Sequence, residues 1–185
     1  SELKKEFSGT LFYSGSSESK KIALTFDDGP SEISCNQALD VLEKFDIKAT
    51  FFLLGQKVHK YPHVVKRIVQ EGHTVAGHSW SHVKMDRISP EALEKEIDNT
   101  ENEIFQLIGV RIGLFRPPYG AVTGDGLNCL EQKGYKVINW SVDSRDWEYP
   151  HNINQIRNNI LNNIKGGAII LFHTMGGKEP SQVIG

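Results

Sequence analysis

Cysteine is scarce in this chain, whose 185 residues include only Cys35 and Cys129. Two cysteines without a CxxC spacing exclude a disulfide scaffold, a cysteine-ligated zinc motif and a dithiol redox site. We expect both thiols to be unpaired and buried, with a single disulfide between them as the alternative.

Long apolar runs and a strong net charge are also absent. No apolar run approaches the roughly 20 residues that span a bilayer, so we expect no membrane span. The formal net charge is −2, and the basic residues are scattered among acidic ones, which excludes the basic surface typical of nucleic-acid binding. The first residues, SELKKEF, lack the pattern of a secretion signal, although a signal or anchor removed upstream would be compatible with this start.

The chain does contain an alternation of compact apolar runs with amphipathic segments. Its length fits one domain covering residues 1–185, with residues 1–20 as an N-terminal extension in which FSGTLFYSG (7–15) could form a β-hairpin. The alternation predicts parallel strands joined by helices. The expected strands are KIALTF (21–26), ATFFLL (49–54), HTVAG (73–77), GLFR (113–116), KVINW (136–140) and AIILF (168–172).

Helices are predicted between these strands from apolar residues at 3.6-residue spacing. One stripe contains Leu39, Leu42 and Phe45. The clearest helix follows Ser89, a good N-cap, and has Pro90 in its first turn.

Ionisable or ring-bearing residues follow five of the six expected strands. Parallel strands place their carboxyl ends on one face, where sites are built, so we expect these residues to converge. They are Asp27 and Asp28, His78 and His82, Arg116 to Tyr119, Asp143 to Trp147, and His173.

Two of these groups suit a divalent metal ion. His78 and His82 stand at i and i+4 and can face one point, while a carboxylate in the DDGP turn can complete a two-histidine, one-aspartate set. One of Asp27 and Asp28 would bind the cation, and the other, turned to the opposite side, would take a proton from water. Spacing alone does not decide which. Ser79 stands where a zincin protease has its glutamate, which disfavours that class.

His173 and Arg116 each have two interpretations. His173 is either a buried histidine bonded to backbone or, with Asp146 beside it, a protonated acid for a leaving amine. Arg116 either caps a turn or holds Asp27 ionised and oriented. The RPPYG turn could present a backbone N–H to a developing oxyanion.

Five ordered motifs together resemble those of the polysaccharide deacetylases, the NodB-homology domain of carbohydrate esterase family 4. The resemblance covers residues 21–173, and the ordered set is far more specific than any single motif. The motifs are TFDDGP (25–30), HSWSH (78–82), RPPYG (116–120), DSRDW (143–147) and LFH (171–173).

The resemblance implies an α/β fold, a distorted (β/α) barrel of about seven parallel strands, and a chain that ends before the family's last helix and strand. It implies one divalent cation, Zn²⁺ with Co²⁺ or another divalent ion as alternatives, bound by Asp28, His78 and His82. Asp27 resembles the catalytic base, Arg116 the residue that orients it, and His173, tuned by Asp146, the general acid. Tyr119 resembles the residue whose backbone N–H binds the oxyanion, and Trp147 and Leu171 join it in receiving the acetyl methyl group.

The implied function is hydrolytic removal of N-acetyl groups from N-acetylglucosamine-containing polysaccharide of the peptidoglycan or chitin type. Alternatives are an acetylxylan-type O-acetyl esterase with the same site, a catalytically silent sugar-binding homologue, and a small-molecule amidohydrolase. The expected partner is an N-acetylated glycan polymer or oligomer. We expect a monomer that is extracellular or associated with the cell wall.

Overall fold

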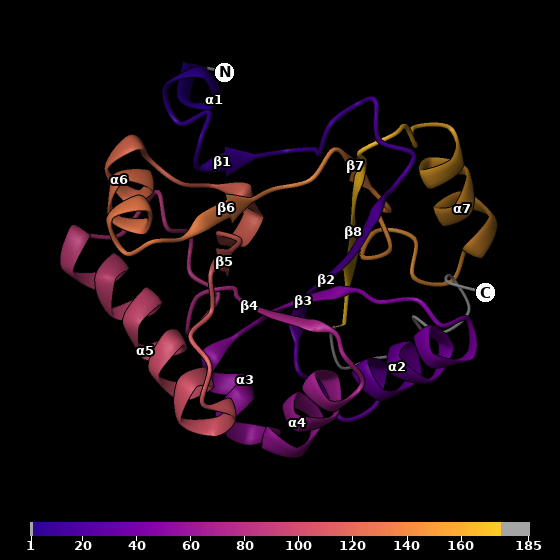
Figure 1. Ribbon diagram of the computed structural model, residues 1–185, viewed down its shortest axis with the longest axis horizontal. Helices are drawn as coiled ribbons and strands as arrows, with labels where there is room; N and C mark the ends of the chain where they lie inside the picture. The colour runs from indigo at the N-terminus through magenta and orange to yellow at the C-terminus, as the bar shows by residue number, and fades with distance from the viewer. Residues whose placement is uncertain (1, 175–185) are drawn as a thin grey trace.

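Eight parallel strands form one curved sheet in the computed structural model, which describes residues 2–174 (Figure 1). The strand order is β1-β6-β5-β4-β3-β2-β8-β7. Each of the six expected runs contains a strand, and the expected parallel α/β barrel of about seven strands is confirmed; β1 and β7 are the two strands that were not among the six runs. The strands are β1 (Leu11–Phe12), β2 (Ala23–Gly29), β3 (Thr50–Leu53), β4 (Thr74–Gly77), β5 (Leu114–Phe115), β6 (Lys136–Ile138), β7 (Val142–Asp143) and β8 (Ile169–His173).

The N-terminal hairpin predicted within residues 7–15 was wrong. Residues Glu2–Glu6 form helix α1, and β1 pairs in parallel with β6. The N–H of Val137 donates to the carbonyl of Thr10, and the N–H of Asn139 donates to that of Phe12, both at 2.7 Å. The segment therefore finds its partner more than a hundred residues away. The expected loss of a final helix and strand concerns residues beyond Thr174 and lies outside the described residues.

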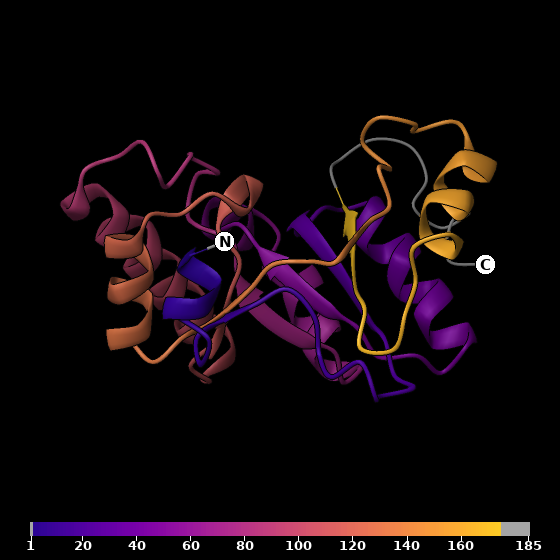
Figure 2. The same cartoon turned by 90° about the horizontal axis from the view of Figure 1, so that it is seen from above.

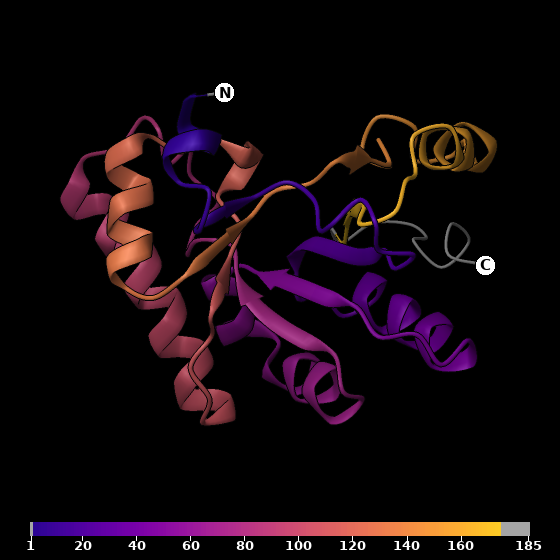
Figure 3. The same cartoon turned by 45° about the horizontal axis from the view of Figure 1, so that its top comes forward.

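Helices α2 to α6 are arranged around the outside of the curved sheet (Figure 3). Seen from above, α5 and α6 stand at one end of the molecule and α2 and α7 at the other (Figure 2). In residues 2–174 no helix is both long and apolar enough to cross a membrane. The helices after α1 are α2 (Ser34–Lys44), α3 (Gly55–Lys60), α4 (Pro62–Gln70), α5 (Pro90–Ile108), α6 (Gly124–Gln132) and α7 (Ile153–Leu161).

Helix α5 begins and ends as its sequence predicts. The side chain of Ser89 accepts a hydrogen bond from the N–H of Ala92, and Pro90 occupies the first turn, where its missing N–H leaves no bond unmade. Gly109 ends the helix with φ of 71°, a left-handed conformation that glycine adopts without steric cost.

Aromatic rings on neighbouring strands form the centre of the core. Phe26 stacks on Phe51 at 5.0 Å and on Phe172 at 5.4 Å between ring centroids, which ties β3, β2 and β8 together. Phe45, expected on the buried stripe of α2, is instead 48% exposed because the helix ends at Lys44. Both cysteines are unpaired as predicted, although Cys129 is only partly buried.

Candidate metal and catalytic site

The site begins where β2 departs from a regular strand. Pairing with β3 shifts register between Asp27 and Gly29, and Asp28 has φ of 70°. In a regular strand, adjacent side chains point to opposite faces, whereas a residue added at a bulge can be redirected. Both carboxylates accordingly approach the same atom, Nε2 of His78, at 3.7 Å from Asp27 and 3.3 Å from Asp28. The expectation that the two acids turn to opposite sides was wrong.

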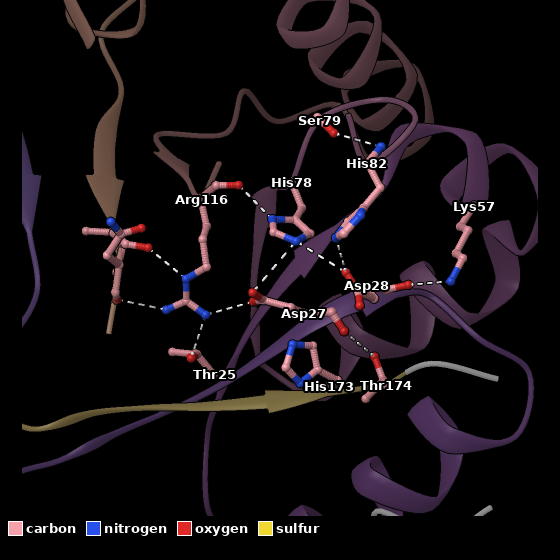
Figure 4. Close-up of polar contacts among 12 residues, drawn as sticks. Thr25, Asp27, Asp28, Lys57, His78, Ser79, His82, Arg116, His173 and Thr174 are labelled. Atoms are coloured by element: carbon pink, nitrogen blue, oxygen red, sulfur yellow. Dashed lines mark hydrogen bonds and ion pairs between the residues drawn. The ribbon is translucent and has the colours of Figure 1, made fainter. Parts of the chain in front are cut away.

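Asp28, His78 and His82 form a compact group of possible metal ligands, drawn from β2, the end of β4 and the loop that follows it. One ligand atom of each lies within 4.8 Å of the others. Oδ1 of Asp28 is 3.0 Å from Nε2 of His82 (Figure 4). Asp28 and His78 are buried, while the side chain of His82 is 27% exposed and leaves the group open on one side.

The donor set fits a divalent cation. Nδ1 of His78 lies 2.6 Å from the carbonyl oxygen of Arg116, which can only accept, so Nδ1 must carry the proton. Nε2 is then the ring atom that faces Oδ1 of Asp28, at 3.3 Å. Oδ1 of Asp28 is itself buried without a hydrogen-bond donor. A two-histidine, one-carboxylate set with open positions is a common arrangement for catalytic zinc.

Asp28 is an anion in this setting. Burial disfavours its charged form, but contacts with His78 and His82 and their charges together outweigh burial and lower the pKa of Asp28 well below its usual range. A hydrogen bond also restrains its backbone, because Nζ of Lys57 donates to the carbonyl of Asp28 at 2.7 Å.

Arg116 holds the other carboxylate. Its guanidinium has no exposed surface and donates through Nη1 to Oδ1 of Asp27 at 2.7 Å. A buried guanidinium must have its N–H groups satisfied, and the remaining bonds reach Thr25, Ile138 and Asn139. The bond to Arg116 leaves Oδ2 of Asp27 directed toward His78.

His173, at the end of β8, is paired with Asp146. Oδ1 of Asp146 lies 2.7 Å from Nδ1 of the ring, and Oδ2 accepts the backbone N–H of His173 at 2.7 Å. Burial would lower the pKa of His173, but the hydrogen bond and charge of Asp146, with the charges of Asp27 and Asp28, raise it to about 9. The ring is therefore an imidazolium at neutral pH, and Figure 4 shows it beside the two carboxylates.

The three residues expected around the acetyl group lie in different settings. Tyr119 has φ of 61°, is 59% exposed, and its ring packs edge-on against His82 at 4.9 Å. Trp147 directly follows Asp146 and is 55% exposed, whereas Leu171 is buried in β8. Tyr119 therefore contacts the group of possible metal ligands.

One residue near the site was missed from the sequence. Glu96 of α5 accepts hydrogen bonds from the backbone of Trp80 and Ser81, which lie between His78 and His82. The sequence feature that could have identified it is an acidic residue next to Leu93 and Ile97, on the buried side of an amphipathic helix. A charged side chain at such a position needs a partner.

Comparisons with known proteins agree with this arrangement. The family model described as polysaccharide deacetylase matches residues 14–138. The chain is 36% identical over 165 residues to a peptidoglycan-N-acetylglucosamine deacetylase of Bacillus cereus. That alignment covers 89% of this chain, and the chain spans 60% of the relative's length.

Two solved structures are similar to this protein in fold. A peptidoglycan N-acetylglucosamine deacetylase in complex with 4-naphthalen-1-yl-N-oxidanyl-benzamide superposes with a TM-score of 0.92 at 34% identity, covering 97% of this chain and 84% of that one. A CE4 family pseudoenzyme from Bacillus anthracis superposes with a TM-score of 0.85 at 27% identity. That alignment covers 90% of this chain and 59% of the pseudoenzyme. Because the family model matches most of the chain, this protein belongs to the polysaccharide deacetylase family.

Proposed function

We propose that this protein is a polysaccharide N-deacetylase that uses one divalent metal ion. Zn²⁺ is the preferred assignment, and Co²⁺ is the alternative. It would remove N-acetyl groups from N-acetylglucosamine-containing polysaccharide and release acetate. The observation that carries the proposal is the convergence of Asp28, His78 and His82 beside a buried carboxylate, Asp27, and a paired imidazolium, His173.

The cation, when bound, would polarise the acetyl carbonyl and lower the pKa of water. Asp27 accepts the proton of the attacking water, since Arg116 binds its Oδ1 and leaves Oδ2 available. As the new carbon–oxygen bond forms and the carbon–nitrogen bond breaks, His173 donates its proton to the departing amine. The products are acetate and a free amino sugar.

The surroundings of the acetyl group are also part of the proposal. The backbone N–H of Tyr119 would donate to the developing oxyanion, a role supported by the contact of its ring with His82. Trp147 and Leu171 would contact the methyl group together with Tyr119.

The name of the Bacillus cereus relative supports a peptidoglycan-type substrate over chitin. A glycan of that type lies outside the cell membrane, and we therefore assign the protein to the extracellular space or the cell wall. We propose that it acts as a monomer on the polymer or on its oligomers.

The test is acetate release by the metal-reconstituted protein from peptidoglycan, chitooligosaccharide and acetylxylan, with Asp27→Asn as the matched inactive control. The proposal requires release from an N-acetylated glycan that Asp27→Asn abolishes. Release from acetylxylan alone would identify an O-acetyl esterase. Binding of glycan without any release would place the chain with silent homologues such as the pseudoenzyme, and activity on monomers alone would indicate a small-molecule amidohydrolase.

A further inference from the structure

One side chain of helix α5, that of Glu96, contacts the residues between His78 and His82. We define the histidine loop as residues 79–81, which join His78 to His82. Oε2 of Glu96 accepts the N–H groups of Trp80 and Ser81, each at 2.9 Å. Oε1 accepts the hydroxyl of Ser81 at 2.8 Å. One carboxylate thus holds three donors of the histidine loop.

The histidine loop needs such support because its backbone is unusual. Ser79 has φ of 70° and His82 has φ of 64°. These are left-handed backbone conformations that residues other than glycine rarely adopt. The N–H of His82, which follows the loop, donates to Oγ of Ser79 at 3.0 Å. This local bond does not attach the loop to the rest of the fold.

Contacts from α3 hold the opposite side of the histidine loop. The N–H of Gly55 donates to the carbonyl of Ser79 at 3.0 Å, and that of Gln56 to the carbonyl of Trp80 at 3.2 Å. Helix α3 therefore binds the loop's carbonyl groups, while Glu96 binds its N–H groups. The loop is fixed between two helices, and His82 follows it directly.

The hydrogen bonds of the Glu96 carboxylate go to the histidine loop. Throughout residues 2–174, no arginine, lysine or histidine forms an ion pair with Glu96, so its carboxylate is stabilised by the three loop donors. An ionised carboxylate only accepts hydrogen bonds and makes stronger ones than a neutral acceptor. Its helix is fixed independently, since Leu93 and Ile97 of α5 are buried in the core.

We infer that Glu96 is a positioning residue of the metal site, which fixes the histidine loop so that His82 faces Asp28. The inference rests on the proposed function, because it assumes that these residues bind a cation. Glu96 itself touches neither the cation nor the substrate. Outer-shell groups that orient ligands in this way typically change metal affinity by roughly 10- to 100-fold.

The experiment measures Co²⁺ affinity by competition with a chelator, the visible absorption of bound Co²⁺, and the thermal midpoint of the metal-free protein. Glu96→Ala removes all three bonds. Glu96→Gln keeps the length, and its amide can still accept the two N–H groups and donate to Ser81. Glu96→Asp is too short to reach all three donors. The matched control is Glu94→Ala, which removes an exposed carboxylate of the same helix that points toward Lys133.

We expect Glu96→Ala to bind Co²⁺ at least about tenfold more weakly with an altered absorption spectrum. Glu96→Gln should stay near wild type, Glu96→Asp should fall between, and Glu94→Ala should match wild type. Wild-type affinity in Glu96→Ala, with only a lower thermal midpoint, would overturn the inference and leave a purely structural role.

Two further outcomes are decisive. If Glu96→Ala does not fold, the Asp and Gln variants decide, and equal affinity in both would overturn the inference. If the wild-type protein itself takes up no Co²⁺, the proposed metal site fails and the inference fails with it. Normal uptake by wild type together with an unaffected Glu96→Ala refutes the inference alone.

Discussion

At the scale of single residues, the site contains two carboxylates that share a strand and both approach His78 but differ in their other partners. Asp27 is neutralised by the buried guanidinium of Arg116, and Asp28 faces His78 and His82. Removing one partner of a buried ion pair leaves the other charge uncompensated, which is costly. Each carboxylate is therefore held in its own role by its neighbours, although the two are adjacent in sequence.

Replacing Asp27 by Asn separates these roles. The amide is the same size and still accepts the Arg116 bond, but it cannot take a proton from water. We expect turnover to fall by at least about 100-fold, while the bound metal content, measured by elemental analysis, stays at the wild-type value. A variant that keeps normal acetate release would remove Asp27 from its role as base.

The His173–Asp146 pair predicts a pH dependence. Because the folded pKa of His173 is raised from 6.5 to about 9, the pair's contribution to stability is fully present below pH 6.5 and is lost as pH rises through 9. In Asp146→Asn, the pKa of His173 should fall, because burial is then opposed only by more distant charges. Titration of the His173 ring by NMR in metal-free protein measures both values, and an unchanged pKa would contradict the assigned pairing.

At the scale of elements, helix α3 packs against the histidine loop at a position where only glycine fits. A Cβ built on Gly55 would lie 2.4 Å from Cε3 of Trp80 and 3.0 Å from the backbone of Thr100. This close approach packs the Trp80 ring against the start of α3. The start of α3 and the histidine loop therefore depend on each other.

Substitution of Gly55 tests that packing. We expect Gly55→Ala to lower the free energy of unfolding by about 1–3 kcal/mol, as overpacking does, measured by urea denaturation. The matched control is Gly113→Ala, because a Cβ at Gly113 meets nothing within 4 Å, and its effect should stay within about 0.5 kcal/mol. Equal effects at the two glycines would show that α3 yields to accommodate the methyl group.

At the scale of the whole molecule, the proposed metal connects β2 with the end of β4 and the loop that follows. A ligand that binds only the folded state stabilises it by an amount that grows with its concentration, about 2.7 kcal/mol at 100 times its Kd. Metal binding should therefore be visible as stability of the entire chain.

Metal removal tests this link. We expect a chelator to lower the thermal midpoint of the wild-type protein and adding Zn²⁺ to restore it. In His82→Ala the midpoint should be insensitive to both additions, because one of three ligands is lost. Calorimetry with and without the chelator gives the comparison, and a metal-dependent midpoint in His82→Ala would mean that the cation binds elsewhere.

The sequence by itself determined which residues meet. Asp28, His78 and His173 follow predicted strands, and parallel strands bring their carboxyl ends to one face, so their convergence followed from order along the chain. The helix after Ser89 was equally predictable, because capping is a local interaction. Only the tertiary structure decided how the residues face each other. The bulge that turns Asp28 beside Asp27, the grip of Glu96 on the histidine loop and the parallel pairing of β1 with β6 depend on contacts between distant segments. Such contacts leave no periodic pattern in the sequence, because each is fixed by the positions of atoms that only folding brings together.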